Sequence, residues 1–71
     1  MSRDLEKHVG QRIRKHRQAK GLSQEKLASL SGCHRTYVGM VERAEKSISV
    51  AALSKFAEGL GVSMSDLLEG L

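Results

Sequence analysis

The side chains best suited to hydrogen-bonding chemistry gather in one short stretch, His34, Arg35, Thr36 and Tyr37. Arginine presents a planar fork of donors that fits two acceptors at once, such as guanine O6 and N7 or two phosphate oxygens. Threonine adds a hydroxyl and a methyl group, and the imidazole and phenol add further donors and acceptors. This stretch is therefore suited to an anionic partner that is rich in acceptors.

Groupings for catalysis or metal binding are weak by comparison. No serine, cysteine or carboxylate pair comes with a plausible general base in a context that would form a cleft, so we expect no enzyme. Cys33 and His34 are adjacent and point in different directions, and neither His8 nor His16 completes a paired ligand spacing. We expect no metal site and no cofactor.

Charge is distributed unevenly along the 71 residues. The chain has 12 Lys and Arg against 8 Asp and Glu, for a formal net charge of +4. Ten basic and four acidic residues lie at or before Arg43, whereas two basic and four acidic residues follow it. The first part favours a polyanionic partner, and the last third favours contact with protein.

The composition predicts a single all-α domain over residues 1–71. The sequence has no Pro or Trp and few aromatics, while Leu, Ala, Glu and Lys recur. A domain of this size is marginally stable, so a partner subunit would help. One cysteine, no secretion signal and no long apolar segment favour the cytoplasm and exclude a membrane partner.

Hydrophobic periodicity and capping residues predict five helices that position this stretch. The expected N-caps are Ser23, Ser49 and Ser63, the last in a capping box with Asp66, and the expected C-terminal glycines are Gly21, Gly32 and Gly61. The expected inward residues are Leu5, Val9, Ile13 and His16; Leu27, Ala28 and Leu30; Tyr37, Val38 and Val41; Val50, Leu53, Phe56, Ala57 and Leu60; and Met64, Leu67 and Leu68.

The second and third helices have the spacing of a helix-turn-helix. Counted from Gln24, the small residue Ala28 falls at position five, Gly32 at nine, Val38 at fifteen and Val41 at eighteen. Two helices that cross steeply need a small residue at the closest approach, glycine at the turn and branched residues behind it. Phage repressors and Cro proteins share this spacing.

A wider pattern resembles the Xre/Cro-like regulator family over nearly the whole chain. It consists of Arg12-Ile13-Arg14, Arg17, Gly21-Leu22-Ser23-Gln24-Glu25, Leu27-Ala28, Glu42-Arg43 and Leu60-Gly61-Val62-Ser63. Within that family, Arg35-Thr36-Tyr37-Val38-Gly39 and Val41-Glu42-Arg43 are similar to the controller proteins of restriction-modification systems. The resemblance implies a compact, lambda-repressor-like five-helix domain that binds a pseudo-palindromic DNA operator as a homodimer and regulates transcription.

The resemblance also implies roles for individual residues. Base contacts are expected from Arg35, Thr36 and His34, and readout should concentrate at the first two because Gly39 and Met40 offer no strong donor. For Arg35 the alternative is a phosphate contact or a solvated side chain, and for His34 it is a helix cap. The expected contacts to the DNA backbone are Gln24, Tyr37, Arg43, Lys46, Ser47 and Ser49.

Other implied features are structural. Arg17 and Glu42 match an ion pair that joins the first and third helices in the family. Tyr37 has the alternative of packing at the edge of the domain. Relatives commonly have glycine at the position of Ala44 and proline at that of Ile48, which leaves the conformation of this loop open.

The C-terminal third is the expected self-association surface. Its candidate residues are Phe56, Met64, Leu67, Leu68 and Leu71, and the alternative places them inside the monomer core. The expected partners are double-stranded DNA and a second copy of the chain, with RNA polymerase as a further candidate. Two rival functions are an antitoxin or phage-type repressor, and a protein-interaction module that has lost DNA binding.

Overall fold

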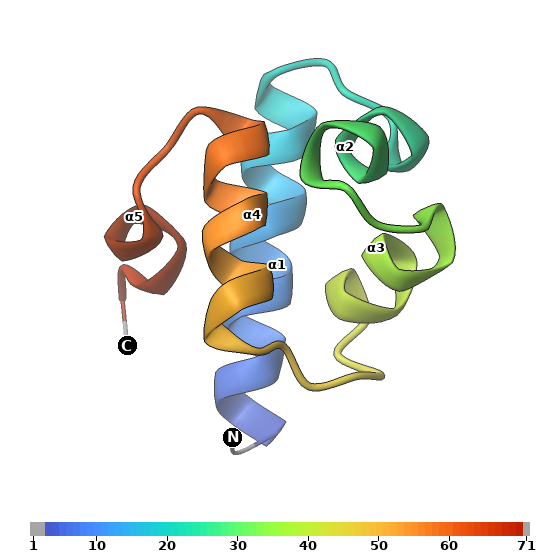
Figure 1. Cartoon of the computed structure of the whole chain (residues 1–71). Helices are drawn as coiled ribbons and strands as arrows, with labels where there is room; N and C mark the ends of the chain where they lie inside the picture. Colours follow the sequence, from blue (N-terminus) through green and yellow to red (C-terminus); the bar gives the residue numbers. More distant parts are fainter. Residues whose placement is uncertain (1–2, 71) are drawn as a thin grey trace.

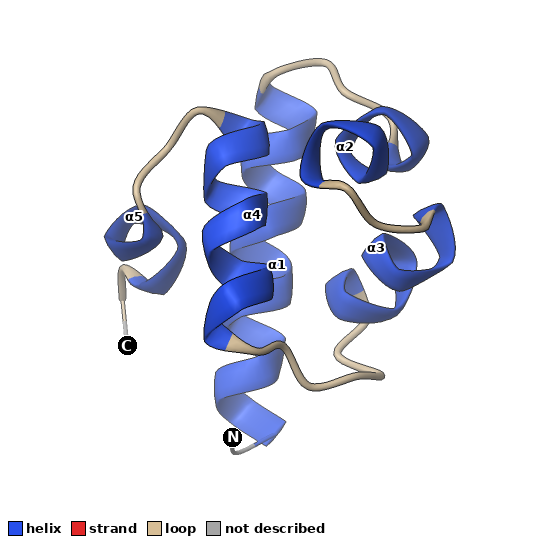
Figure 2. Cartoon of the chain, in the orientation of Figure 1, coloured by secondary structure: helices blue, strands red, loops and turns tan. Residues whose placement is uncertain are grey.

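The computed structural model describes residues 3–70, and that range contains five α-helices and no strand. The helices are α1 (Arg3–Ala19), α2 (Gln24–Ser31), α3 (Arg35–Glu42), α4 (Val50–Leu60) and α5 (Met64–Leu68). Figure 2 shows them joined by short loops. The all-α, five-helix prediction is confirmed.

The helices pack around a shared core. In Figure 1, α4 lies in front of α1, the α2–α3 pair lies on one side of them and α5 on the other. The pair is held from both directions, because α2 packs on α4 while α3 packs on α1. The large side chains that are fully buried are Val9, Ile13, Leu27, Val38, Phe56, Leu60 and Leu67.

The predicted helix ends agree with the structure. The hydroxyls of Ser23, Ser49 and Ser63 each accept a hydrogen bond from the backbone N–H three residues later, which is typically worth about 1 kcal/mol per cap. Ser63 and Asp66 form the complete capping box. Gly32 and Gly61 end α2 and α4 with φ of 70° and 69°, a left-handed conformation that glycine adopts without strain.

Two of the residues predicted to face inward are exposed instead. Leu30 is 48% exposed and Val50 is 75% exposed. On α2 it is Ser31, one residue further on, that faces α4 and is buried, which leaves Leu30 at the rim. Val50 is the first residue of α4, ahead of the turn that enters the core.

Two glycines inside helices permit close contact between helices. A Cβ atom on Gly10 of α1 would lie 2.4 Å from the carbonyl oxygen of Val41, so only glycine lets α1 approach the end of α3 this closely. A Cβ atom on Gly59 of α4 would lie 2.7 Å from the hydroxyl of Ser31. These two contacts seat the α2–α3 pair on the rest of the domain.

The loop between α3 and α4 takes a defined course despite its two departures from the family pattern. Ala44 adopts a left-handed conformation with φ 59°, which is unfavourable for a residue with a Cβ atom, and its side chain is buried. Ile48 is 8% exposed and joins the hydrophobic core. The loop is thus anchored by apolar burial at both positions.

Candidate nucleic-acid interface

α2 and α3 form a helix-turn-helix. Gly32 ends α2 in the left-handed conformation, and the chain turns through Cys33 and His34 into α3. Ala28, Val38 and Val41 are buried, with exposures of 3%, 0% and 2%. The four residues that matched the helix-turn-helix spacing therefore occupy the turn and the buried side of the two helices.

Arg35 and Thr36 lie at the start of α3 with both side chains exposed. The Arg35 guanidinium lies 3.7 Å from the carboxylate of Glu25, in the first turn of α2. Sequence reasoning did not single out Glu25, because the pair bridges two helices that only the fold brings together. We call the exposed side chains of Arg35, Thr36 and Arg43, together with the half-buried Gln24, the reading surface.

His34 caps α3. Its Nδ1 atom accepts a hydrogen bond of 3.1 Å from the backbone N–H of Thr36. The capping alternative is therefore present in the structure, and Nε2 is the ring nitrogen left for any contact with a base. The base contact stays a prediction.

Arg17 of α1 and Glu42 of α3 form a buried ion pair. Arg17 Nε and Nη2 donate to the two carboxylate oxygens at 2.7 and 3.0 Å, and Nη1 donates to the carbonyl oxygen of Leu22 at 2.8 Å. The exposed fractions of the two side chains are 11% and 2%. Because both charges are buried, each depends on the other.

The same carboxylate also holds Gln24, the first residue of α2. The Gln24 amide donates from Nε2 to Glu42 Oε1 at 3.1 Å. The residue sits where free backbone N–H groups and the helix dipole favour an anion. Its side chain is therefore oriented from within the core, a link that the sequence analysis missed because 18 residues separate the two positions.

Gly39 provides the space in which the Arg43 guanidinium lies. A Cβ atom on Gly39 would be 2.9 Å from Arg43 Nη1 and 3.4 Å from Gln24 Oε1. Arg43 Nη2 donates to Glu45 Oε1 at 3.1 Å, and this hydrogen bond and the charge of Glu45 raise the pKa of the arginine. Because Gly39 has no side chain, the Arg43 guanidinium can lie over it and beside Gln24.

Tyr37 packs against the core. Its ring stacks on Phe56 with a centroid distance of 6.0 Å and an interplanar angle of 11°. Burial, with a smaller effect of Cys33, raises the pKa of the phenol. The packing alternative is therefore present, while contact of the hydroxyl with a phosphate stays a prediction.

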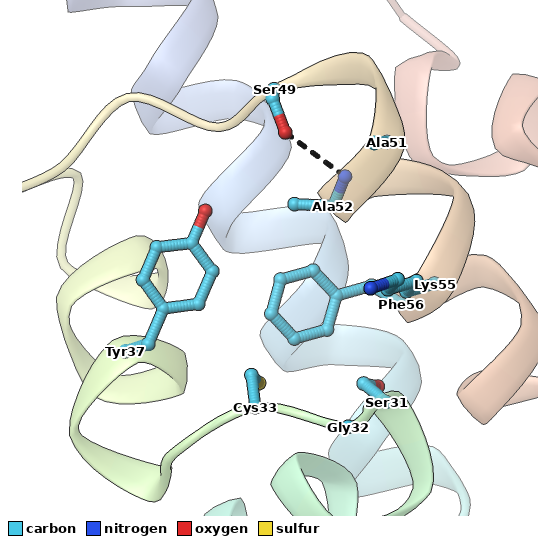
Figure 3. Close-up of a pocket in the computed structure, with 9 residues that line it drawn as sticks. All are labelled: Ser31, Gly32, Cys33, Tyr37, Ser49, Ala51, Ala52, Lys55 and Phe56. Atoms are coloured by element: carbon cyan, nitrogen blue, oxygen red, sulfur yellow. Dashed lines mark hydrogen bonds between the residues drawn. The ribbon is translucent and has the colours of Figure 1, made fainter.

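A pocket of about 200 Å³ opens between the α2–α3 turn and α4 (Figure 3). Tyr37 and Phe56 line it together with Cys33, Ser49 and Lys55. Burial raises the pKa of the Cys33 thiol, against a smaller opposing effect of Lys55. The thiol is therefore protonated at neutral pH and is a weak nucleophile.

The remaining predicted contacts to the DNA backbone follow α3. Lys46, Ser47 and Ser49 are all exposed. The Ser47 hydroxyl donates to Glu6 at 3.4 Å, whereas the Ser49 hydroxyl caps α4 through the N–H of Ala52. Their contacts with phosphate stay predictions.

The predicted self-association surface needs a correction. Phe56 is 1% exposed and Leu67 is 0% exposed, so both belong to the monomer core and offer a partner no surface. Leu67 is buried because its helix α5 packs on α1 and α4, where Arg12 donates to the Asp66 carbonyl at 2.8 and 3.1 Å. Phe56 is buried on the other side of α4, against Tyr37 of α3. Met64 and Leu68 remain half-buried, and Leu71 lies outside the described residues.

The other candidate ligands are dispersed. His8 donates to the Glu69 carbonyl oxygen and His16 contacts Arg12, on the side of α1 that faces α5, whereas Cys33 and His34 lie in the turn after α2. Within residues 3–70, no three His, Cys, Asp or Glu side chains come together to hold a metal ion. None of the helices in that range combines the length and apolar character that crossing a membrane requires.

Comparison with known proteins identifies the family. The family model described as "Helix-turn-helix" matches residues 13–67. The control protein C.SmaI of Serratia marcescens is 40% identical over 65 residues, which cover 92% of this chain and 77% of that protein. The control protein C.BamHI of Bacillus amyloliquefaciens is 37% identical over 70 residues, covering 97% of this chain and 86% of that protein.

Solved structures agree with these relatives. The restriction-modification controller protein C.AhdI from Aeromonas hydrophila superimposes with a TM-score of 0.85 at 47% identity, covering 87% of this chain and 94% of that one. The wild-type controller C.Esp1396I superimposes with a TM-score of 0.85 at 35% identity, covering 92% and 84%. The chain therefore belongs to the Xre-like family of helix-turn-helix DNA-binding transcriptional regulators, in which it is similar to the controller proteins of restriction-modification systems.

Proposed function

We propose that this protein is the controller of a restriction-modification system and that it binds a pseudo-palindromic operator as a homodimer in the cytoplasm. The observation that carries this proposal is the exposed pair Arg35 and Thr36 at the start of α3, presented by a helix-turn-helix. Proteins named as controllers support it, because C.BamHI matches 97% of this chain in sequence and C.AhdI matches 87% of it in structure.

Arg35 and Thr36 read bases in the major groove. In the helix-turn-helix mode of binding, the first residues of the second helix meet the edges of the base pairs. The guanidinium can bridge O6 and N7 of guanine, and Thr36 can contact a thymine methyl group or an acceptor. His34 adds a contact from the N-cap of α3.

Backbone contacts fix the register of the protein on DNA. Gln24 is held by Glu42 at the first turn of α2, so its second amide hydrogen and the free backbone N–H groups meet one phosphate. Arg43, Lys46, Ser47, Ser49 and the hydroxyl of Tyr37 meet further phosphates.

The homodimer multiplies the discrimination of a short reading helix. α3 has eight residues and reaches only a few base pairs, while a genome offers about a million or more competing sites. A twofold dimer places its reading helices about 34 Å apart, one turn of DNA. We assign the self-association surface to the exposed parts of Met64 and Leu68 together with Leu71.

Selection of bound duplexes from a random pool tests the reader and the symmetry together. We expect a twofold consensus with half-sites one turn apart. When the selected duplex is titrated at several salt concentrations, the slope of log affinity against log salt should be near −7 if the dimer contacts about eight phosphates. A slope near zero would exclude DNA binding. A single half-site, or a monomer in sedimentation with and without the selected duplex, would exclude the dimer.

The variant Arg35→Ala tests the assignment of base reading. We expect its affinity for the selected operator to fall while its affinity for a random duplex changes little, with a loss of about 1–3 kcal/mol in discrimination. Arg14→Ala is the matched control, because Arg14 is an exposed arginine of α1 outside the reading surface. A uniform loss on both duplexes would show that Arg35 contacts phosphate.

A further inference from the structure

Each exposed arginine of the reading surface is paired with an exposed glutamate. Arg35 Nη1 lies 3.7 Å from Glu25 Oε2, with side-chain exposures of 68% and 78%. Arg43 Nη2 lies 3.1 Å from Glu45 Oε1, with exposures of 56% and 52%. The surface proposed to meet a polyanion therefore carries two carboxylates that lower its positive charge.

The two pairs differ in what they connect. Arg43 and Glu45 are two residues apart, at the end of α3 and in the following loop. Arg35 and Glu25 belong to different helices, so this pair crosses from the first turn of α2 to the first turn of α3. Glu25 and Gln24 both belong to the first turn of α2, the helix end at which a phosphate contact is proposed.

We propose that Glu25 is a specificity-determining residue, which holds Arg35 toward the major groove and opposes its use on phosphates. This inference rests on the proposed function. A guanidinium has five N–H donors, so Arg35 can offer a two-pronged contact to guanine while another N–H still faces Glu25. On DNA without the operator, Arg35 must leave Glu25 to reach a phosphate, and the carboxylate repels that phosphate.

This arrangement makes Glu25 a repulsive element that acts against the wrong duplex. Discrimination between two ligands increases when one of them meets an uncompensated like charge. Exposed ion pairs are individually weak, so we expect an effect of a few-fold. Glu45 provides a comparison for Glu25. Under the proposal Arg43 meets a phosphate in any duplex, so its pair with Glu45 is broken equally on the operator and on a random duplex.

Glu25→Gln tests the inference, measured by titration of the operator selected above and of a random duplex across a range of salt. We expect affinity for the random duplex to rise about three- to fivefold, with a salt slope steeper by about 0.9 for each subunit, or about 1.8 for the dimer. Affinity for the operator should change by less than about twofold, so the specificity ratio falls. Glu45→Gln should raise the affinity for both duplexes equally. Glu58→Gln is the control for charge alone, since Glu58 is exposed on α4 outside the reading surface.

Repeating Glu25→Gln in the Arg35→Ala background separates an effect through Arg35 from simple repulsion. We expect the specificity ratio to be insensitive to Glu25→Gln in that background. An unchanged ratio in the single variant, or an equal fall in both backgrounds, would overturn the inference about Glu25. If the wild-type protein itself showed no salt-dependent binding to DNA, the proposed function would be overturned instead.

Discussion

The guanidinium of Arg17 and the carboxylate of Glu42 face each other edge to edge, with two hydrogen bonds of 2.7 and 3.0 Å. This contact ties α1 to α3, and the bond from Gln24 to the same carboxylate extends it to the start of α2. One buried carboxylate thus connects the scaffold to the reading surface.

Removing either partner of this ion pair should strongly destabilise the protein. Arg17→Met or Glu42→Gln leaves a buried group without its partner, which typically costs about 3–5 kcal/mol. The double variant Arg17→Met/Glu42→Gln should lose less than the sum of the two, because it removes the unpaired charge that each single variant leaves. Urea unfolding of all four proteins measures this coupling, and strictly additive losses would contradict it.

The effect of Gly59→Ala on stability should change sign when Ser31 is replaced by alanine. Gly59→Ala places a Cβ atom 2.7 Å from the Ser31 hydroxyl, and such overpacking costs about 1–3 kcal/mol. That hydroxyl is buried and has no hydrogen-bond partner within the described residues. Ser31→Ala should therefore be close to neutral.

In the Ser31→Ala background the same Gly59→Ala substitution should become favourable by about 0.5–1 kcal/mol, because alanine suits a helix interior better than glycine. Thermal unfolding of the two single variants and the double variant makes the comparison. An equal effect of Gly59→Ala in both backgrounds would show that the hydroxyl is not the obstacle.

Gly39→Ala should separate stability from DNA affinity. The new methyl group would meet Arg43 Nη1 at 2.9 Å, and the flexible side chain can move away. Helix propensity should then raise the free energy of unfolding by about 0.5–1 kcal/mol. Displacement of the guanidinium from beside Gln24 should weaken operator binding. Filter binding and thermal unfolding measure the two effects, and unchanged operator affinity would show that Arg43 does not act from this position.

Acid should weaken the N-terminal cap of α5. Hydrogen bonds from Ser63 lower the pKa of Asp66 below its ordinary value of 3.8. A carboxyl whose pKa is lower in the folded state stabilises the fold above its unfolded pKa. That contribution is lost as the pH falls through the lower folded value.

The difference in stability between the wild type and Asp66→Asn should therefore be constant near neutral pH and shrink below pH 3.8. Urea unfolding at a series of pH values tests this. Asp4→Asn is the control, because Asp4 is an exposed acidic residue in the first turn of another helix, α1. A difference that stays constant into strong acid would contradict the role of the ionised carboxylate.

Much of the fold could be predicted because its signals are local. A serine followed three residues later by an acceptor, as in Ser63 and Asp66, acts within one turn of helix. Glycine at position 32 is favoured by the left-handed conformation of its own backbone. The spacing of Ala28, Val38 and Val41 predicted the helix-turn-helix for the same reason, since it spans only two short helices.

Apolar periodicity identified which face of a helix avoids water, but it could not say what covers that face. Phe56 and Leu67 were assigned to a partner subunit as the leading interpretation, yet both are inside the monomer: Phe56 packs against Tyr37 of α3, and Leu67 is covered because α5 packs on α1 and α4. Leu30 shows the converse, because the close approach of Gly59 to Ser31 leaves it at the rim.

By itself, the sequence determined the five helices, their caps and the presence of Arg35 and Thr36 at the start of α3, since these depend on neighbours along the chain. Only the tertiary structure decided that Glu42 holds Gln24, that Glu25 faces Arg35 and that Arg43 lies over Gly39. The first two contacts join different helices, and the third depends on the space left where α2 and α3 meet. Helical periodicity gives the direction of each side chain from its own axis, whereas the packing of one helix on another sets which side chains meet.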